Sequence, residues 1–191
     1  RGKFDSEFKN FIKKKNVSFI KHDLTKNKIP LTSKNYYLIF HFAAIVGVAN
    51  VVNKPFEVLT KNVLTLKNLI DFAKTQKKLA RFIFSSTSEV YAGSLRNGLL
   101  HFPTKESSLL SINEEMNARD SYMLSKIYGE NMCRFSNLPY LIIRPHNIFG
   151  ERMGMSHVIP ELIKKTKSNQ NFLNVYNPHH KRTFCYIGDA I

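Results

Sequence analysis

The chain has 191 residues, of which 43% are hydrophobic, which is enough for one substantial core. Its formal net charge of +15 would suit a nucleic-acid partner, but the lysines are scattered, so attraction of anionic small molecules is favoured over nucleic-acid binding. No run approaches the roughly 18 apolar residues of a membrane span, so we expect a cytoplasmic protein. Cys133 and Cys185 lack metal-ligand spacing, so we expect neither a metal site nor a disulfide framework.

Strands and helices alternate through the first part of the sequence. Residues 17–20 are predicted to be a short strand, and residues 36–42 a longer one that is apolar on both faces, as buried parallel strands are. Apolar residues recur every three or four positions between residues 55 and 78, which predicts a helix. Residues 81–84 are the next strand, and segment 94–119 is predicted to be a long loop.

The alternation continues to the end of the chain. Asp120 or Ser121 could cap a helix that runs to about residue 135, and a buried strand follows at 138–144. A helix at 158–167 and strand-like pieces at 172–176 and 183–187 complete the series. This order predicts an α/β fold with a doubly wound parallel sheet and helices on both of its faces. Ligands bind such sheets beyond the carboxyl ends of the strands.

Tyr122 and Lys126 are a candidate proton-handling pair. They lie four residues apart on the predicted helix, so both side chains project from one face. A tyrosine with a pKa of about 10 is a poor base at neutral pH, but an adjacent ammonium would lower that pKa. The same spacing arises by chance in many helices. The hydroxyls of Ser86 and Thr87, at the end of the preceding strand, could bind the same substrate oxygen.

A series of short motifs, in the same order along the chain, resembles the extended short-chain dehydrogenase/reductases, and within them the nucleotide-sugar epimerase and dehydratase branch that includes UDP-glucose 4-epimerase. The motifs are His22-Asp23-Leu24-Thr25, His41-Phe42-Ala43-Ala44, Asn62, Phe84-Ser85-Ser86-Thr87-Ser88-Glu89-Val90-Tyr91, Ser121-Tyr122-Met123-Leu124-Ser125-Lys126, Arg144-Pro145-His146-Asn147-Ile148-Phe149-Gly150 and Arg182-Thr183-Phe184-Cys185-Tyr186-Ile187-Gly188-Asp189. The resemblance implies a Rossmann-like fold and an NAD cofactor.

The resemblance also assigns roles to residues. Thr87 would hold the sugar hydroxyl, Tyr122 would take its proton, and Lys126 would tune Tyr122 and bind the nicotinamide ribose. The implied cofactor contacts are Asp23 at the adenine, Leu24, Ala43, Ala44, Asn62, Ser85, Pro145 and His146, together with Tyr122 and Lys126. The implied substrate contacts are Thr87, Ser88, Asn147 and Arg182, of which Arg182 would clamp the diphosphate. Core packing would equally explain Ala43 and Ala44, and a surface position would explain Arg182.

Two departures from the family pattern matter. The glycine-rich loop that places the NAD pyrophosphate on a helix N-terminus is not found, and family order would put it before Arg1. We therefore expect a chain truncated at both ends and inactive alone, with residues 1–157 as a partial NAD-binding domain and residues 158–191 as the start of the substrate-binding region. The turn at 177–179 also differs from the usual Gly-Asp-Gly.

The resemblance implies oxidation of a sugar hydroxyl to a transient keto sugar, after which the branches of the family diverge. Glu89, two residues after Thr87, could act as a general acid or base, as in nucleotide-sugar 4,6-dehydratases or UDP-glucuronate decarboxylases. Segment 147–160 differs from that of the decarboxylases and favours a UDP-sugar 4-epimerase. A non-catalytic NAD- or RNA-binding protein is the alternative of another class. The family also implies a homodimer through helices 55–78 and 120–135, and it leaves the sugar, the nucleotide and the choice between NAD and NADP open.

Overall fold

A three-stranded parallel sheet lies at the centre of the fold. The computed structural model describes residues 5–26, 29–30, 35–155, 157–168, 173–175, 177–179 and 181–191. The strand order is β1 (Leu38–His41), β2 (Arg81–Ser85) and β3 (Tyr140–Ile143), with β2 in the middle. A second, two-stranded parallel sheet pairs β4 (Ile148–Phe149) with β5 (Cys185–Tyr186). The predicted α/β fold with a parallel sheet is confirmed.

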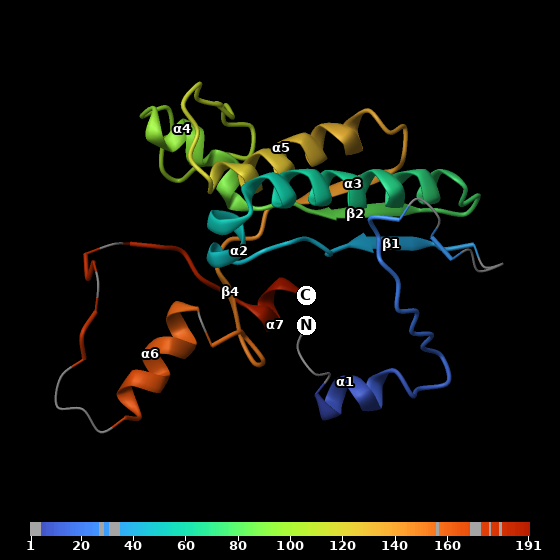
Figure 1. The fold of residues 1–191 in the computed structure, drawn as a ribbon, viewed down its shortest axis with the longest axis horizontal. Coiled ribbons are helices and arrows are strands. Elements are labelled where there is room, and N and C mark those ends of the chain that lie inside the picture. Colours follow the sequence, from blue (N-terminus) through green and yellow to red (C-terminus); the bar gives the residue numbers. More distant parts are fainter. Residues whose placement is uncertain are drawn as a thin grey trace.

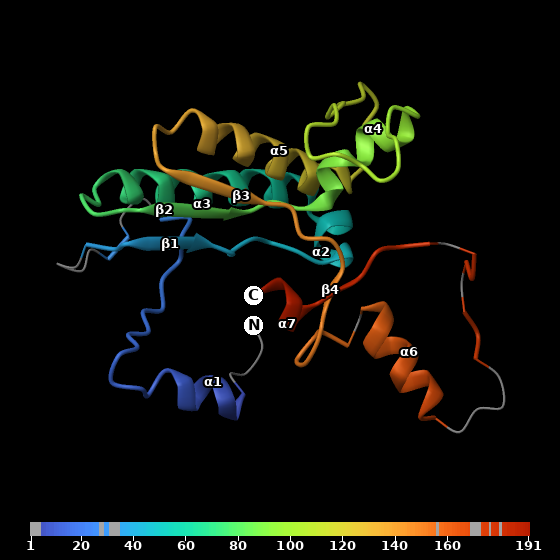
Figure 2. The same cartoon turned by 180° about the vertical axis from the view of Figure 1, so that it is seen from behind.

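Two long helices, α3 (Pro55–Lys74) and α5 (Asp120–Arg134), lie side by side over one face of the three-stranded sheet (Figures 1 and 2). Pro55 occupies the first turn of α3, where its missing N–H costs nothing. The shorter helices are α1 (Ser6–Phe11), α2 (Val48–Asn53), η1 (Ser88–Tyr91), α4 (Ala92–Arg96), α6 (Val158–Thr166) and α7 (Ile187–Ala190). None of the helices in the described ranges is long and apolar enough to cross a membrane.

The core lies between the sheet and these two helices. Its buried members are Ile39 from β1, Phe82 and Phe84 from β2, Leu66, Ile70 and Ala73 from α3, and Cys133 from α5. Gly129 on α5 marks the closest approach, because a Cβ there would lie 2.5 Å from Cζ of Phe84. The glycine thus lets α5 rest directly on the central strand.

On the opposite face of the sheet the two outer strands expose apolar side chains, whereas Ile83 of the central strand is only 6% exposed. Phe40, Ile83 and Leu141 lie in register across the three strands on that face. Phe40 is 55% exposed and Leu141 49% exposed. The expected helices on both faces are therefore not found in the described part of the chain, where both long helices that pack on the sheet lie on the same side.

Most predicted elements are confirmed, with boundaries shifted by a few residues. The helices at 55–78, 120–135 and 158–167 and the strands at 36–42, 81–84 and 138–144 are all present. Segment 94–119 is irregular beyond the end of α4, as expected. The strand at 183–187 shrinks to the two residues of β5.

Three local predictions are wrong or fall partly outside the structure. Residues 17–20 form no strand, because no described strand lies beside them to supply a ladder, and Phe19 packs instead edge-on against Phe8. Residues 173–175 are not in a strand either, while 172 and 176 lie outside the described residues. Neither Asp120 nor Ser121 caps α5, because both lie within the helix, which begins at Asp120. The Asp120 carboxylate accepts hydrogen bonds from the Asn117 amide and from Arg96.

Candidate active site

Helix α5 brings Tyr122 and Lys126 to the carboxyl end of the central strand. The Lys126 ammonium lies 5.6 Å from the centroid of the Tyr122 ring and 5.0 Å from that of Phe84. Its Nζ donates a hydrogen bond of 2.7 Å to the carbonyl of Ser85, the last residue of β2. Lys126 is only 4% exposed. The pair is thus built into the junction between α5 and β2, at the sheet edge where ligands bind in this type of fold.

Burial dominates the proton affinities of both side chains. It lowers the pKa of Lys126 to about 8. It also raises the pKa of Tyr122 to about 12, and the Glu89 carboxylate adds to that rise. The expectation that Lys126 brings the pKa of Tyr122 down is therefore wrong, because burial of the phenol dominates that pKa, while the hydrogen bond of the ammonium goes to the Ser85 carbonyl. Tyr122 is a neutral phenol here.

The polar residues after β2 turn back against the end of β3. Thr87 accepts a hydrogen bond of 3.3 Å from the Glu89 amide through its hydroxyl oxygen, which caps η1 and leaves the O–H able to donate. The Ser88 amide donates to the Pro145 carbonyl at 3.1 Å. Glu89 is exposed, yet its negative charge contributes to the raised pKa of Tyr122. The predicted site residues that follow β2 and those that follow β3 therefore lie together beside α5.

Asn62 on α3 clamps the segment that follows β1. Its Oδ1 accepts a bond of 2.7 Å from the Ile45 amide, and its Nδ2 donates to the Ile45 carbonyl and to Ser125 of α5. Ala43 is exposed and Ala44 is half-buried, so core packing does not explain the two small residues. Asn62 instead fixes a stretch of open backbone next to the helix that carries Tyr122.

A second asparagine of α3, which the sequence analysis missed, holds another predicted cofactor segment. Asn68 is 3% exposed, and its Nδ2 donates to the carbonyls of Leu24, at 2.9 Å, and Lys26, at 3.2 Å. Asp23 is exposed, and bonds from the Thr25 hydroxyl and amide lower the pKa of its carboxyl. Because buried amides need partners, two asparagines on an apolar helix face were a usable signal.

His41, at the end of β1, is the second residue that the sequence analysis did not single out as functional. It is 2% exposed, its ring packs edge-on against Phe84 at 5.7 Å, and neither ring nitrogen has a hydrogen-bond partner among the described residues. Burial, with the charge of Lys126, lowers its pKa to about 4. The imidazole is therefore neutral at physiological pH.

The remaining predicted contacts lie further along the chain. Asn147 has a positive φ of 41° and donates through Nδ2 to the Thr183 carbonyl at 2.9 Å, with His146 beside it. Arg182 precedes Thr183 and is exposed. Among the described contacts, none joins Asp23 or Arg182 to Tyr122 or Lys126, so the structure brings the centre of the predicted site together but not its two outer ends.

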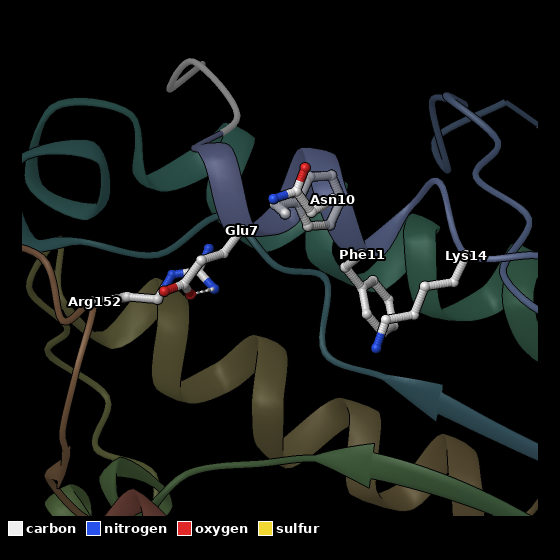
Figure 3. A pocket seen from close by; sticks show the side chains of 6 residues that line it. Glu7, Asn10, Phe11, Lys14 and Arg152 are labelled. Carbon is white, nitrogen blue, oxygen red and sulfur yellow. Dashed lines mark hydrogen bonds and ion pairs between the residues drawn. The ribbon is translucent and has the colours of Figure 1, made fainter.

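Figure 3 shows a hollow elsewhere on the molecule, between α1 and the segment after β4. Arg152 there pairs with Asp5 and, at 3.2 Å, with Glu7. The hollow is lined by Glu7, Phe8, Asn10, Phe11, Lys14 and Arg152. None of the predicted site residues lines it.

A Rossmann-like parallel sheet with a Tyr–Lys pair at the carboxyl end of its central strand defines the short-chain dehydrogenase/reductase class. Residues 4–191 match the model of the NAD dependent epimerase/dehydratase family, and the chain belongs to that family. It is 30% identical to UDP-N-acetyl-alpha-D-glucosaminuronate decarboxylase of Bacillus cytotoxicus, over 88% of this chain and 52% of the relative.

Two further comparisons also match proteins described as nucleotide-sugar epimerases. An uncharacterised UDP-glucose epimerase of Bacillus subtilis is 24% identical over 96% of this chain and 55% of its own length. The crystal structure of UDP-glucuronic acid 4-epimerase from Bacillus cereus has a TM-score of 0.74 at 24% identity, over 95% of this chain and 55% of that chain, which shows a shared fold. The chain thus spans about half the length of these relatives.

Proposed function

We propose that the whole protein is an NAD-dependent enzyme that oxidises a hydroxyl of a nucleotide sugar to a transient keto sugar, and that it acts as a UDP-sugar 4-epimerase. The observation that carries the proposal is the buried Lys126 beside Tyr122 at the carboxyl end of β2. Membership of the NAD dependent epimerase/dehydratase family supports it. So does the convergence of Thr87 and Glu89 on the same end of the sheet.

The residues present fit an NAD cofactor in their chemistry. Asp23 offers an exposed carboxylate of lowered pKa, Asn62 fixes the open backbone after β1, and Lys126 carries an ammonium whose present partner is a carbonyl oxygen. We propose that Asp23, Ala44 and Lys126 hold the cofactor, with Leu24, Ala43, Ser85, Pro145 and His146 as its further contacts. Bound NAD would supply the hydride acceptor.

The protein's own residues would handle the proton. The Thr87 hydroxyl donates a hydrogen bond to the sugar hydroxyl, and Tyr122 takes the proton of that hydroxyl. With a pKa of about 12, Tyr122 is almost fully protonated at neutral pH and cannot accept a proton. The complete site must therefore add positive charge or hydrogen-bond donors around the phenol to lower that pKa. Lys126 can contribute by moving from the Ser85 carbonyl toward the phenol and the ligand.

A decarboxylase or 4,6-dehydratase is the second candidate, and Glu89 is the observation that favours it. Its carboxylate is exposed, follows Thr87 by two residues, and acts electrostatically on Tyr122. The 30% identical relative is a decarboxylase of a UDP-linked uronic acid. In this reading Glu89 moves a proton after the keto sugar has formed. In both readings we propose that Ser88, Asn147 and Arg182 bind the substrate.

The test is turnover by the full-length protein. Purified protein is incubated with NAD and a panel of UDP-, GDP- and CDP-linked sugars and uronic acids, and products are identified by NMR. We expect Tyr122→Phe to lower kcat at least ~10²-fold. We expect Tyr37→Phe, directly before β1 and 69% exposed, to leave kcat unchanged. A wild type without turnover, or equal turnover by Tyr122→Phe, would contradict the proposed function.

Glu89→Gln separates the two candidates. An epimerase should keep most of its activity in this variant, because inverting a carbinol centre needs no acid at that position. A decarboxylase or dehydratase should lose product while the keto sugar still forms. Released carbon dioxide or a 6-deoxy-4-keto product from the wild type would decide against the epimerase.

We also propose that the protein is cytoplasmic and forms a homodimer through α3 and α5. Phe56 on α3 is 77% exposed and Phe135, at the end of α5, is 81% exposed, and both would be covered by a partner helix pair. Light scattering of the full-length protein gives its mass in solution. A monomer at micromolar concentration would contradict the dimer.

A further inference from the structure

A buried ion-pair network lies behind the Tyr122–Lys126 pair, on the next turn of α5. Glu130 is 0% exposed, and Arg144, at the end of β3, binds it with two parallel hydrogen bonds of 2.7 and 2.6 Å. Ser86 adds a bond of 2.6 Å and Arg134 one of 3.1 Å. Although burial favours the neutral acid, the bonds from Arg144 and Ser86 hold the pKa of Glu130 below its usual range. The carboxylate is therefore charged and fully satisfied.

Arg144 uses the rest of its guanidinium to reach the long loop. Its Nη1 donates to the backbone carbonyl of Glu106 at 2.8 Å and to the Tyr91 hydroxyl at 2.5 Å. The Tyr91 hydroxyl in turn donates to the same carbonyl at 3.4 Å. The guanidinium carbon lies 5.0 Å from the centroid of the Tyr91 ring. One rigid, planar cation thus links α5, β3, η1 and the loop, which a lysine could not do.

The loop is anchored at other points, and they place it against the same helix. The Ser94 hydroxyl accepts a bond of 2.9 Å from the Ser111 amide and donates to the Leu109 carbonyl. Leu110 packs on the small cluster of Val90, Met123 and Ile127. Leu110 therefore lies against the turn of α5 that carries Tyr122, and Glu106 is bonded to Arg144, which directly precedes the proposed site residues Pro145 and His146.

We infer that Arg144 and Tyr91 are positioning residues that hold the backbone at Glu106, so that segment 101–111 forms one wall of the sugar pocket. The inference rests on the proposed function for the place of the sugar. The contact that holds this wall is made by a main-chain carbonyl, that of Glu106.

The experiment compares Tyr91→Phe with the wild type in the full-length protein. The variant keeps the ring beside Arg144, the Glu130–Arg144 pair and the direct bond from Arg144 to the Glu106 carbonyl, and it removes only the Tyr91 hydroxyl that also bridges to that carbonyl. Trypsin reports on the loop, because Lys105 is exposed and directly precedes Glu106. Loss of one such hydrogen bond corresponds to about 5–10-fold in the populations involved. We therefore expect cleavage after Lys105 to be about 5–10-fold faster, with cleavage after Lys15 unchanged.

Kinetics of the same variant tie the loop to the substrate. We expect the KM for the nucleotide sugar to rise about 5-fold or more while kcat stays within about twofold. Tyr37→Phe is the matched control, with both values unchanged. A merely structural role would lower thermal stability without this split between KM and kcat. If cleavage after Lys105 and KM are both unchanged in an active enzyme, the inference is wrong. A wild type without turnover defeats the proposed function instead.

Discussion

Gly129→Ala tests how tightly α5 is seated on the central strand. In an exposed helix interior this change stabilises by about 1 kcal/mol, because alanine loses less backbone entropy. Here the new Cβ would lie 2.5 Å from Cζ of Phe84 and 2.9 Å from Cδ2 of Leu66, against the roughly 3.5–4.0 Å of a normal carbon contact. Phe84 is 2% and Leu66 1% exposed, so neither can turn into solvent. Overpacking of about 1–3 kcal/mol should outweigh the gain in helix propensity.

The expected result is a net loss of up to about 2 kcal/mol in the free energy of unfolding, measured by urea titration with an unchanged m-value. The control is the double variant Gly129→Ala/Phe84→Leu, since a smaller side chain at position 84 makes room for the methyl group. The summed losses in the free energy of unfolding of the two single variants should then exceed the loss in the double variant. A Gly129→Ala protein more stable than the wild type would show that Phe84 and Leu66 yield freely, and that α5 does not sit as closely as described.

Two further predictions concern the site itself. Lys126, with its pKa lowered to about 8 by burial, binds a proton less readily in the folded than in the unfolded chain, so its contribution to the free energy of unfolding should rise with pH between about 8 and 10, by up to about 3 kcal/mol. Lys126→Met should abolish this rise in urea titrations, and an equal rise in the variant would exclude Lys126 as its source. Asn62→Leu should lower the free energy of unfolding by about 1–3 kcal/mol, because the Ile45 amide loses its acceptor. A change below about 0.5 kcal/mol, measured in the same way, would mean that water replaces the side chain.

The elements around the site were largely predictable from local pattern. The helix at 55–78 follows from apolar residues at helical spacing, and the strand at 81–84 from a short apolar run that ends in hydroxyl residues. Both signals are local, because the backbone conformation of a segment and its buried face are encoded in the segment itself. The strand predicted at 17–20 shows the limit, since a strand also needs a neighbour for its hydrogen bonds.

The site was predictable as a set of residue types but not as a charge distribution. The sequence by itself determined the spacing of Tyr122 and Lys126 on one helix face and the order of the motifs around them. Only the tertiary structure decided that Lys126 turns to the Ser85 carbonyl and that the pKa of Tyr122 rises. The reason is that desolvation depends on atoms from several distant segments.

The same holds for the network of Glu130, Arg144 and Tyr91. Nothing in the local pattern distinguishes Glu130 from a solvated helix residue, because its burial is created by elements that meet only in the folded chain. The sequence determined which helix carries the proton-handling pair. The packing of that helix on the end of β2 and beside the loop decided which side chains are buried, which are charged, and what holds the loop in place.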